Sequence, residues 1–369
     1  MNVMPVMQFG AAPAAVQPAP VVSCRGVWKV FGASQVVERV LDDLLAGKMD
    51  GTRARREHGC VVAVNNASFD VYPSEVFCIM GLSGSGKSTL IRHINRLIEP
   101  TSGDIRIDDR SISTLDARSL RELRARKIGM VFQNVALLPH RTVEENTRLP
   151  LELRGEAGTA AQDAVHRALS IVGLAGWEGC YPRELSGGMQ QRVGLARALA
   201  ADADVLLMDE PFSALDPLIR RQLQDEFRRL VKSLGKTALF ITHDLDEAIR
   251  IGDRIAIMRD GKIMQIGTPA EIVLSPADDY VGQFVEGISP VHFVDAERIM
   301  VPPGQELAQG IPDGWPVARR DTRLSRLIEL HTASGHRIAV ADDGRLVGVV
   351  GAREILMAVQ GRPQEKKEA

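Results

Sequence analysis

Residues 81–88 have the types and the spacing of a loop that binds phosphate groups. They read Gly-Leu-Ser-Gly-Ser-Gly-Lys-Ser and fit the pattern GxxxxGK[ST] at every required position. Glycines allow successive backbone N–H groups to point at phosphate oxygens, and a following helix adds the partial positive charge of its N-terminus. We expect Lys87 to reach the β- and γ-phosphates and the Ser88 hydroxyl to bind Mg²⁺. The nucleotide-binding residues predicted from this motif are Gly81, Ser83, Gly84, Ser85, Gly86, Lys87, Ser88 and Thr89.

Two carboxylates follow a second apolar strand further along the chain. Residues 205–208 are apolar and directly precede Asp209 and Glu210. At the carboxyl end of a strand, Asp209 is placed to bind Mg²⁺, and Glu210 can polarise the water that attacks the γ-phosphate. General-base assistance of this kind contributes about 10²–10⁴-fold in rate. An acidic strand end that only caps the next helix is the alternative, which the phosphate loop upstream disfavours.

Residues 185–192 read Leu-Ser-Gly-Gly-Met-Gln-Gln-Arg and open a further predicted helix. Two glycines there would cost roughly 1 kcal/mol each in a helix if they served no ligand. The segment resembles the signature sequence of ABC ATPases. The resemblance implies a homodimer that encloses two ATP molecules, in which this segment closes on the γ-phosphate held by the other subunit. The residues it assigns to that contact are Ser186, Gly187, Gly188 and Gln190.

Other elements of the ABC family match residue by residue. The resemblance implies that Gln133 contacts Mg²⁺ and senses a transmembrane partner, and that Asp216 lies in the loop that couples the two active sites. It also implies that His243 contacts the γ-phosphate and positions the attacking water beside Glu210. The predicted catalytic residues are Lys87, Gln133, Glu210 and His243, and the predicted metal ligands are Ser88, Gln133 and Asp209.

The N-terminal part of the chain supplies a predicted adenine contact and an unusual insertion. Phe31 falls where the family places an aromatic ring on the adenine, and Trp28 is a nearby rival for that role. Residues 34–58 then show apolar side chains at helical spacing, and we expect the glycines and basic residues over 47–56 to end that helix. This insertion resembles the ATPases of quaternary-amine importers, which carry glycine betaine, proline betaine or choline.

Strands and helices alternate through most of the chain. The predicted strand–helix pairs are 76–80 with 88–97, 205–208 with 217–234, and 238–241 with 245–251. This alternation is typical of a mostly parallel sheet covered on both faces. Between about 134 and 200 the pattern is helical. We therefore predict an α/β fold of the ABC type, a P-loop ATPase with a RecA-like core and an inserted α-helical subdomain, over residues 21–286 after a disordered tail over 1–20.

The character of the sequence changes after residue 287. Prolines predict a linker over 287–314, and a strand–helix–strand–strand–helix unit follows over 315–360, with Asp343-Gly344 as a hairpin turn. The unit resembles a CBS module, a small α+β fold that the importer ATPases usually carry in tandem, whereas this chain has a single copy. A regulatory nucleotide ligand and a dimerisation role are both open interpretations. Residues 361–369 are predicted to form a charged tail.

Composition constrains the expected partners and the redox compartment of the protein. The formal net charge of −2 argues against a whole-surface attraction to nucleic acid, and no nucleic acid partner is expected. The four cysteines form no CxxC pair, which is typical of reduced thiols in a reducing compartment. No apolar run approaches the roughly 20 residues that cross a bilayer, so any membrane role must come through a partner.

The resemblance implies an ATP-hydrolysing subunit that powers import of a quaternary amine osmolyte, with ATP and Mg²⁺ as cofactors. The expected partners are integral-membrane permease subunits and, through the complex, a periplasmic or extracellular substrate-binding protein. The expected location is the cytoplasmic face of the plasma membrane. The alternatives are an ATPase for another small solute and, less favoured, a non-transport ABC ATPase, whose relatives generally carry inserted modules or two cassettes in one chain.

Overall fold

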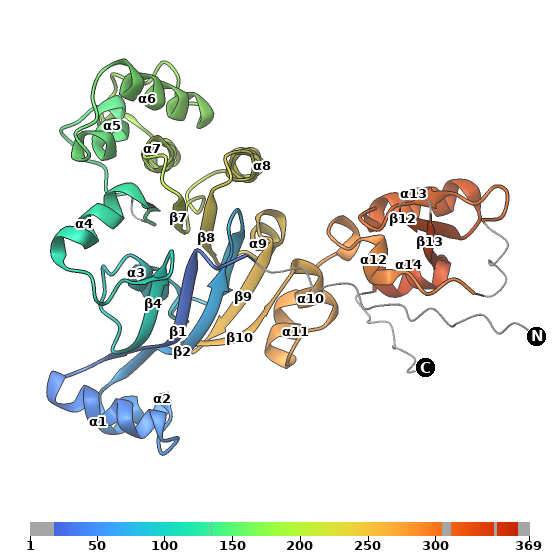
Figure 1. The fold of residues 1–369 in the computed structure, drawn as a ribbon, viewed down its shortest axis with the longest axis horizontal. Helices are drawn as coiled ribbons and strands as arrows, with labels where there is room; N and C mark the ends of the chain where they lie inside the picture. Colours follow the sequence, from blue (N-terminus) through green and yellow to red (C-terminus); the bar gives the residue numbers. More distant parts are fainter. Residues whose placement is uncertain (1–17, 134, 305–310, 343–344, 361–369) are drawn as a thin grey trace, which may run out of the picture.

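The computed structural model describes residues 18–133, 135–304, 311–342 and 345–360. Most of the predicted tail over 1–20, part of the predicted linker, the predicted turn at 343–344 and the tail over 361–369 lie outside these ranges. Figure 1 shows a large α/β part, a helical lobe beside it, and a smaller C-terminal unit beyond α11. No helix in the described ranges is long and apolar enough to cross a membrane.

The larger sheet carries the phosphate loop and the acidic strand end. Its strand order is β10-β9-β3-β8-β7-β6, and all neighbours are parallel except the edge pair β9 and β10. Every residue of β3, β7 and β8 is buried, as continuous apolar strands covered on both faces require. The strands are β3 Val76–Gly81, β6 Ile128–Val131, β7 Val205–Asp209, β8 Thr237–Thr242, β9 Arg254–Arg259 and β10 Lys262–Gly267.

A second, antiparallel sheet packs against the first. Its order is β2-β1-β4-β5, and the rings of Phe69 on β2 and Phe77 on β3 stack with centroids 5.1 Å apart across the core between the sheets. Helix α3 (Lys87–Ile94) adds Leu90, Ile91 and Ile94 to this core. The remaining elements here are β1 Val22–Phe31, β2 Val61–Val71, β4 Ser102–Ile107, β5 Arg110–Ser111 and α4 Ala117–Arg126.

The insertion forms two helices rather than the one expected from the sequence. Helix α1 (Ser34–Leu45) ends before Gly47, and the basic residues lie in a separate helix, α2 (Gly51–His58). The second helix begins because the Asp50 carboxylate accepts a hydrogen bond from the Arg53 N–H at 2.7 Å, and it ends at Gly59 in a left-handed conformation. Both helices pack on a small core that includes Trp28.

Helices make up the lobe beside the sheets (Figure 1). Helix α7 packs against both α5 and α6, and a 3-10 turn, η1, leads into it. The lobe comprises α5 Val143–Leu153, α6 Thr159–Ile171, η1 Pro182–Glu184 and α7 Gly187–Ala200. Helices that follow the strands of the larger sheet are α8 Pro217–Ser233, α9 Leu245–Ile251, α10 Pro269–Leu274 and α11 Asp279–Val285.

The C-terminal unit has its own core around a three-stranded sheet within the described residues, ordered β11-β12-β13. Part of the segment that the sequence suggests as a linker belongs to this core, because Val294, Ala296 and Ile299 are buried in it and Val301 bridges to Val349. The elements are η2 Pro290–His292, α12 Ala296–Ile299, β11 Val317–Ala318, α13 Leu324–Ser334, β12 Ile338–Asp342, β13 Arg345–Val350 and α14 Ala352–Val359.

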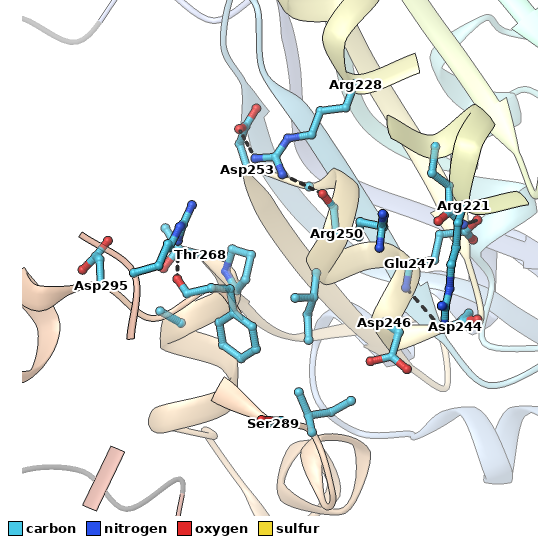
Figure 2. A pocket seen from close by; sticks show the side chains of 18 of the residues that line it. Arg221, Arg228, Asp244, Asp246, Glu247, Arg250, Asp253, Thr268, Ser289 and Asp295 are labelled. Carbon is cyan, nitrogen blue, oxygen red and sulfur yellow. Dashed lines mark hydrogen bonds and ion pairs between the residues drawn. The ribbon is translucent and has the colours of Figure 1, made fainter. Parts of the chain in front are cut away.

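A cleft of about 830 Å³ separates the C-terminal unit from helices α8 and α9. Arg221, Arg228 and Asp246 line it from the ATPase side, and Asp295 and Arg323 from the C-terminal side. Figure 2 shows Asp295 and Asp246 on opposite sides of this cleft.

Candidate active site

The phosphate loop joins the buried strand β3 to helix α3 in a tightly constrained turn. Gly86 has a φ of +98°, and a Cβ placed on it would lie 2.0 Å from the carbonyl oxygen of Ala63. Ala63 belongs to β2, so the loop is wedged against the second sheet. Only glycine fits this conformation and this gap without displacing backbone. The loop is thereby shaped before any ligand binds.

Lys87 and Ser85 are the buried polar side chains of this loop. The Lys87 side chain is buried, and its Nζ donates to the carbonyl oxygens of Gly81 (2.8 Å) and Leu82 (3.0 Å). Burial lowers the pKa of Lys87. The Oγ of Ser85 is buried without a hydrogen-bond partner among the described residues. A bound phosphate would supply the missing partner and take over bonds of the ammonium group.

Asp209 and Ser88 form the predicted metal end of the site. The Ser88 Oγ donates to Asp209 Oδ1 at 2.8 Å, although the two residues come from different elements, α3 and β7. Asp209 is fully buried, its Oδ2 makes no hydrogen bond within the described part of the chain, and burial raises its pKa. Arg92 Nη2 lies 3.5 Å from that oxygen.

These residues fit Mg²⁺, which prefers oxygen ligands. Mg²⁺ is commonly held by one or two carboxylates together with substrate phosphates and waters. Asp209 Oδ2, which accepts no hydrogen bond among the described residues, and the hydroxyl of Ser88 offer that partial set. Among the residues that the structure describes, no group of three or more His, Cys, Asp and Glu side chains could hold a metal by itself. Phosphate oxygens would therefore complete the coordination.

Glu210 lies between two of the predicted catalytic side chains. Its Oε2 is 3.2 Å from the His243 Nδ1 and accepts a hydrogen bond from the Gln133 Nε2 at 3.3 Å. The strand order explains this grouping, because Gln133 follows β6, Glu210 follows β7 and His243 follows β8, which are neighbours in that order. The carboxyl ends of adjacent parallel strands meet at one sheet edge. Glu210 itself is held at a φ of +49°.

The signature segment occupies a different part of the molecule. Ser186 caps α7 by accepting a hydrogen bond from the Met189 N–H at 3.3 Å, and Gly187 is exposed. Figure 1 places α7 in the helical lobe, away from α3. Gln190 is half-buried, and its Nε2 donates back to the carbonyl oxygen of Pro182 at 2.9 Å. The nucleotide contact predicted for Gln190 stays a prediction.

Asp216, Ser83 and Thr89 have less distinctive surroundings. Asp216 caps α8 by accepting a hydrogen bond from the Ile219 N–H at 3.1 Å. Ser83 is exposed in the loop, and Thr89 is half-buried on α3. These contacts do not test the nucleotide-binding roles of Asp216, Ser83 and Thr89, which remain predictions.

The predicted adenine end lies where β1 meets β2. Phe31 pairs with Val61, and both side chains are exposed, at 42% and 46%. Two residues after Val61, Ala63 touches the phosphate loop at Gly86. Trp28 is only 6% exposed and belongs to the core under α1. Of the two candidate rings, Phe31 is the exposed one, and the Lys29 ammonium lies over it, 5.0 Å from its centroid.

Sequence reasoning missed two sets of residues at this site. Arg92 contacts Asp209, and its position four residues after Ser88 on one helix face was a usable signal. Gln191 and Ser213 connect α7 to the loop after Glu210. Their sequence separation of 22 residues carries no such signal.

Comparison with known proteins identifies relatives along most of the chain. The family profile described as ABC transporter matches residues 64–213. The trimethylamine N-oxide transport system ATP-binding protein of Pelagibacter ubique is 46% identical, over 94% of this chain and 99% of its own length. The glycine betaine transport ATP-binding protein of Bacillus subtilis is 54% identical, over 74% of this chain and 65% of its own length. The glycine betaine/proline betaine transport system ATP-binding protein of Escherichia coli is 54% identical over 74% and 68%.

Solved structures support the same conclusion. A dimeric ATP-binding cassette in a post-hydrolysis state, bound to ADP and Pi, matches with a TM-score of 0.58 and 30% identity. The match covers 67% of this chain and 98% of that cassette. The predicted α/β cassette fold and ATP hydrolase activity are confirmed, while the CBS-like nature of the C-terminal unit stays a prediction. The chain belongs to the ABC transporter family, as an ATP-binding subunit that hydrolyses ATP.

Proposed function

We propose that this chain powers the import of a small methylated amine by hydrolysing ATP at the site around Glu210. The observation that carries the proposal is the position of the Glu210 carboxylate between Gln133 and His243. The residue before it, Asp209, ends strand β7 and accepts a hydrogen bond from Ser88 on the phosphate-loop helix. A carboxylate that accepts a hydrogen bond from Gln133 and lies 3.2 Å from the His243 ring can polarise a water held beside these side chains. Relatives named for methylated-amine transport, aligned along most of the chain, support the cargo.

In the proposed reaction, Lys87 neutralises the β- and γ-phosphates and the loop N–H groups hold them in place. Ser88 and Asp209 would hold Mg²⁺, which neutralises charge on the same phosphates when bound. Glu210 polarises the attacking water, and His243 contacts the γ-phosphate and keeps that water beside the carboxylate. Because little covalent chemistry is left to the protein, positioning and charge stabilisation dominate.

The substitution Glu210→Gln tests this assignment directly. The amide keeps the size and the hydrogen bonds of the side chain but cannot act as a base. We expect turnover to fall by about 10²-fold or more, the usual contribution of a general base. ATP binding should persist, so size-exclusion chromatography with ATP should detect a trapped dimer. Hydrolysis at near the wild-type rate would show that Glu210 is not the base.

The dimer in this proposal is functional rather than incidental. Ser186, Gly187 and Gly188 of one subunit would close on the γ-phosphate bound by the other, with Asp216 in the loop between the two sites. The exposed start of α7 supports a contact made in trans, since Ser186 and Gly187 are open to a partner. The dimeric state of the matched cassette structures supports the same arrangement.

An apolar groove offers a docking surface for the permease. It measures about 400 Å³ and is lined by α4, β6, α5 and α7, with Met130, Leu149 and the 76%-exposed Leu153 among its side chains. The apolar stretch after Gln133 is a weaker candidate, because Leu137 packs on the core and Val135 packs against Gly194. Docking would place the chain on the cytoplasmic face of the membrane.

The cargo belongs to one chemical class. Trimethylamine N-oxide, glycine betaine and choline share a positively charged nitrogen with three methyl groups. The alignments with the relatives named for trimethylamine N-oxide cover 98–99% of those proteins and 92–94% of this chain, so they extend into the C-terminal unit. Reconstitution with the permease and binding protein encoded nearby, assayed for ATPase stimulation by each compound, tests the class. Stimulation only by an unrelated solute would refute it.

The C-terminal unit is proposed to be a CBS-like regulatory module, responding to ionic strength or to a nucleotide. The charged cleft in Figure 2 supports this role, because exposed charges across it are screened by salt within about 10 Å at 0.1 M. Arg298 also ties the unit to α10 through Glu271 and Thr268, each at 3.2 Å.

Two variants test regulation at different levels. Deleting residues 286–369 should make transport insensitive to the regulatory signal, and unchanged regulation would refute the idea. The deletion also exposes Ala270 and Leu274, which pack on the core of the unit. The substitution Arg298→Ala leaves that core covered and removes only the tie to α10, so it should weaken regulation without loss of expression.

A further inference from the structure

A buried glutamine joins the signature helix to the loop that follows the catalytic glutamate. Gln191 lies one turn into α7 and is 3% exposed. Its Nε2 donates to the Ser213 Oγ at 3.1 Å, and its Oε1 accepts from the Ala214 N–H at 3.0 Å. The Ser213 Oγ in turn donates to the carbonyl oxygen of Glu210 at 3.1 Å. The side chain of Gln191 is thus committed to one loop.

The direction of each bond in this chain is fixed. A backbone N–H can only donate, so the Gln191 amide must turn its oxygen to Ala214 and its nitrogen to Ser213. The Ser213 hydroxyl therefore accepts from Gln191, and its single proton is left for the Glu210 carbonyl. Hydrogen bonds linked in this way strengthen one another. Removal of the amide would free the hydroxyl to turn away from Glu210.

Glu210 needs such support because its backbone is strained. A non-glycine residue at a φ of +49° is uncommon and costs roughly 1–2 kcal/mol. Its N–H donates to the carbonyl oxygen of Ile241 at 3.1 Å, and its carbonyl accepts from the Ser213 N–H at 3.3 Å as well as from the hydroxyl. The conformation that aims the carboxylate between Gln133 and His243 therefore depends on what holds Ser213.

We propose that Gln191 is a positioning residue for ATP hydrolysis, which holds Glu210 through Ser213 and makes its position depend on α7. The inference rests on the proposed role of Glu210. The start of α7 carries Ser186 to Gly188, so a displacement of this helix when the partner's nucleotide binds reaches Gln191 within one turn. Each subunit would thereby align its own glutamate only when its signature segment is engaged.

Steady-state ATPase kinetics of Gln191→Met, Ser213→Ala and the double variant test the proposal. We expect each single change to lower kcat about tenfold, equivalent to ~1.4 kcal/mol, while KM for ATP stays within about twofold. The double variant should match the single variants, because both break the same chain of bonds. Ser213→Thr keeps the hydroxyl on an exposed residue and should retain most of kcat.

The control is Thr147→Val, which removes a buried hydrogen bond within α5, from the Thr147 Oγ1 to Val143 O at 2.8 Å. Thr147→Val should lower the unfolding temperature about as much as Gln191→Met does, while its kcat stays unchanged. Effects that multiply to about hundredfold in the double variant, or a raised KM with normal kcat, would overturn the proposal. A normal kcat in Gln191→Met beside an inactive Glu210→Gln refutes this inference alone, whereas an active Glu210→Gln refutes the proposed function.

Discussion

Replacing Gly86 with alanine tests whether the phosphate loop depends on the backbone seen in the structure. The residue has a φ of +98°, where a side chain costs roughly 1–2 kcal/mol. The new Cβ would also lie 2.0 Å from the carbonyl oxygen of Ala63, so the loop or strand β2 must move. Overpacking of this kind costs about 1–3 kcal/mol. We therefore expect Gly86→Ala to destabilise the protein by about 2–5 kcal/mol.

Gly84→Ala is a matched control in the same loop. Gly84 has a φ of +80°, but a Cβ on it would meet nothing within 4 Å. It carries the conformational cost without the collision, so the two variants should differ by about 1–3 kcal/mol. Differential scanning calorimetry without nucleotide can measure this, since 1 kcal/mol shifts Tm by about 2–4 °C in a domain of this size. Gly86→Ala should unfold about 2–12 °C below Gly84→Ala.

The comparison separates two explanations of the glycines. If both variants lower Tm equally, the contact between the loop and Ala63 contributes nothing and the loop is not wedged against the second sheet. If Gly86→Ala also weakens binding of a fluorescent ATP analogue more than Gly84→Ala does, the displaced N–H groups of the loop account for the loss. Unchanged Tm in both variants would refute the reasoning from φ as well.

Three further predictions concern other parts of the site. Because burial raises the pKa of Asp209, the folded protein binds the proton of this carboxyl more tightly than the unfolded chain does. The stability that this group confers is therefore lost as the pH rises through the raised pKa. Asp209→Asn should raise Tm without nucleotide at pH 7.5 and abolish the stabilisation by Mg²⁺ and ATP. Phe31→Ala should weaken ATP binding about fivefold, for a stacking contribution near 1 kcal/mol, whereas Trp28→Phe should lower Tm instead, as calorimetry and nucleotide titration can show. Leu153→Arg should abolish co-purification with the permease while Tm stays within a degree or so of wild type, because the side chain is exposed.

The phosphate and acidic elements were predictable from the sequence because each is local. A strand, a glycine-rich turn and a helix are contiguous, so Lys87 and Ser88 follow from spacing alone. The neighbouring arrangement of Gln133, Glu210 and His243 is not local, since it depends on the order of β6, β7 and β8 in the sheet. Family resemblance supplied these residues, and the fold explains why they meet.

Two features escaped the sequence analysis for different physical reasons. Helix α2 has only one buried residue, Ala54, so its sequence shows no apolar periodicity. Asp50 and Gly59, which cap its two ends, were the available sequence signals. Residues 290–301 read as linker because Pro290 begins the segment and Pro302 and Pro303 follow it. The short elements η2 and α12 show no periodicity and are instead fixed by the burial of Val294 and Ile299. Short elements held by tertiary contacts carry little local signal.

Glu210 directly follows β7, the middle one of three neighbouring strands, and contacts from two directions meet there. Gln133, in the segment that leads into the helical lobe, donates a hydrogen bond to the Glu210 carboxylate. Helices of the same lobe line the groove proposed for the permease. From the backbone side, Ser213 holds Glu210 through Gln191 on α7. Arg197, also on α7, donates to the carbonyl oxygen of Val135 at 2.7 Å and fixes the segment after Gln133. Helix α7 therefore holds both Ser213 and the segment after Gln133. A shift of the lobe against the sheets would then move the Glu210 carboxylate and its donor, the Gln133 amide, together. An ATPase subunit that hydrolyses ATP only when its partner subunit and its permease are both bound would need one element, such as α7, that contacts both segments beside Glu210.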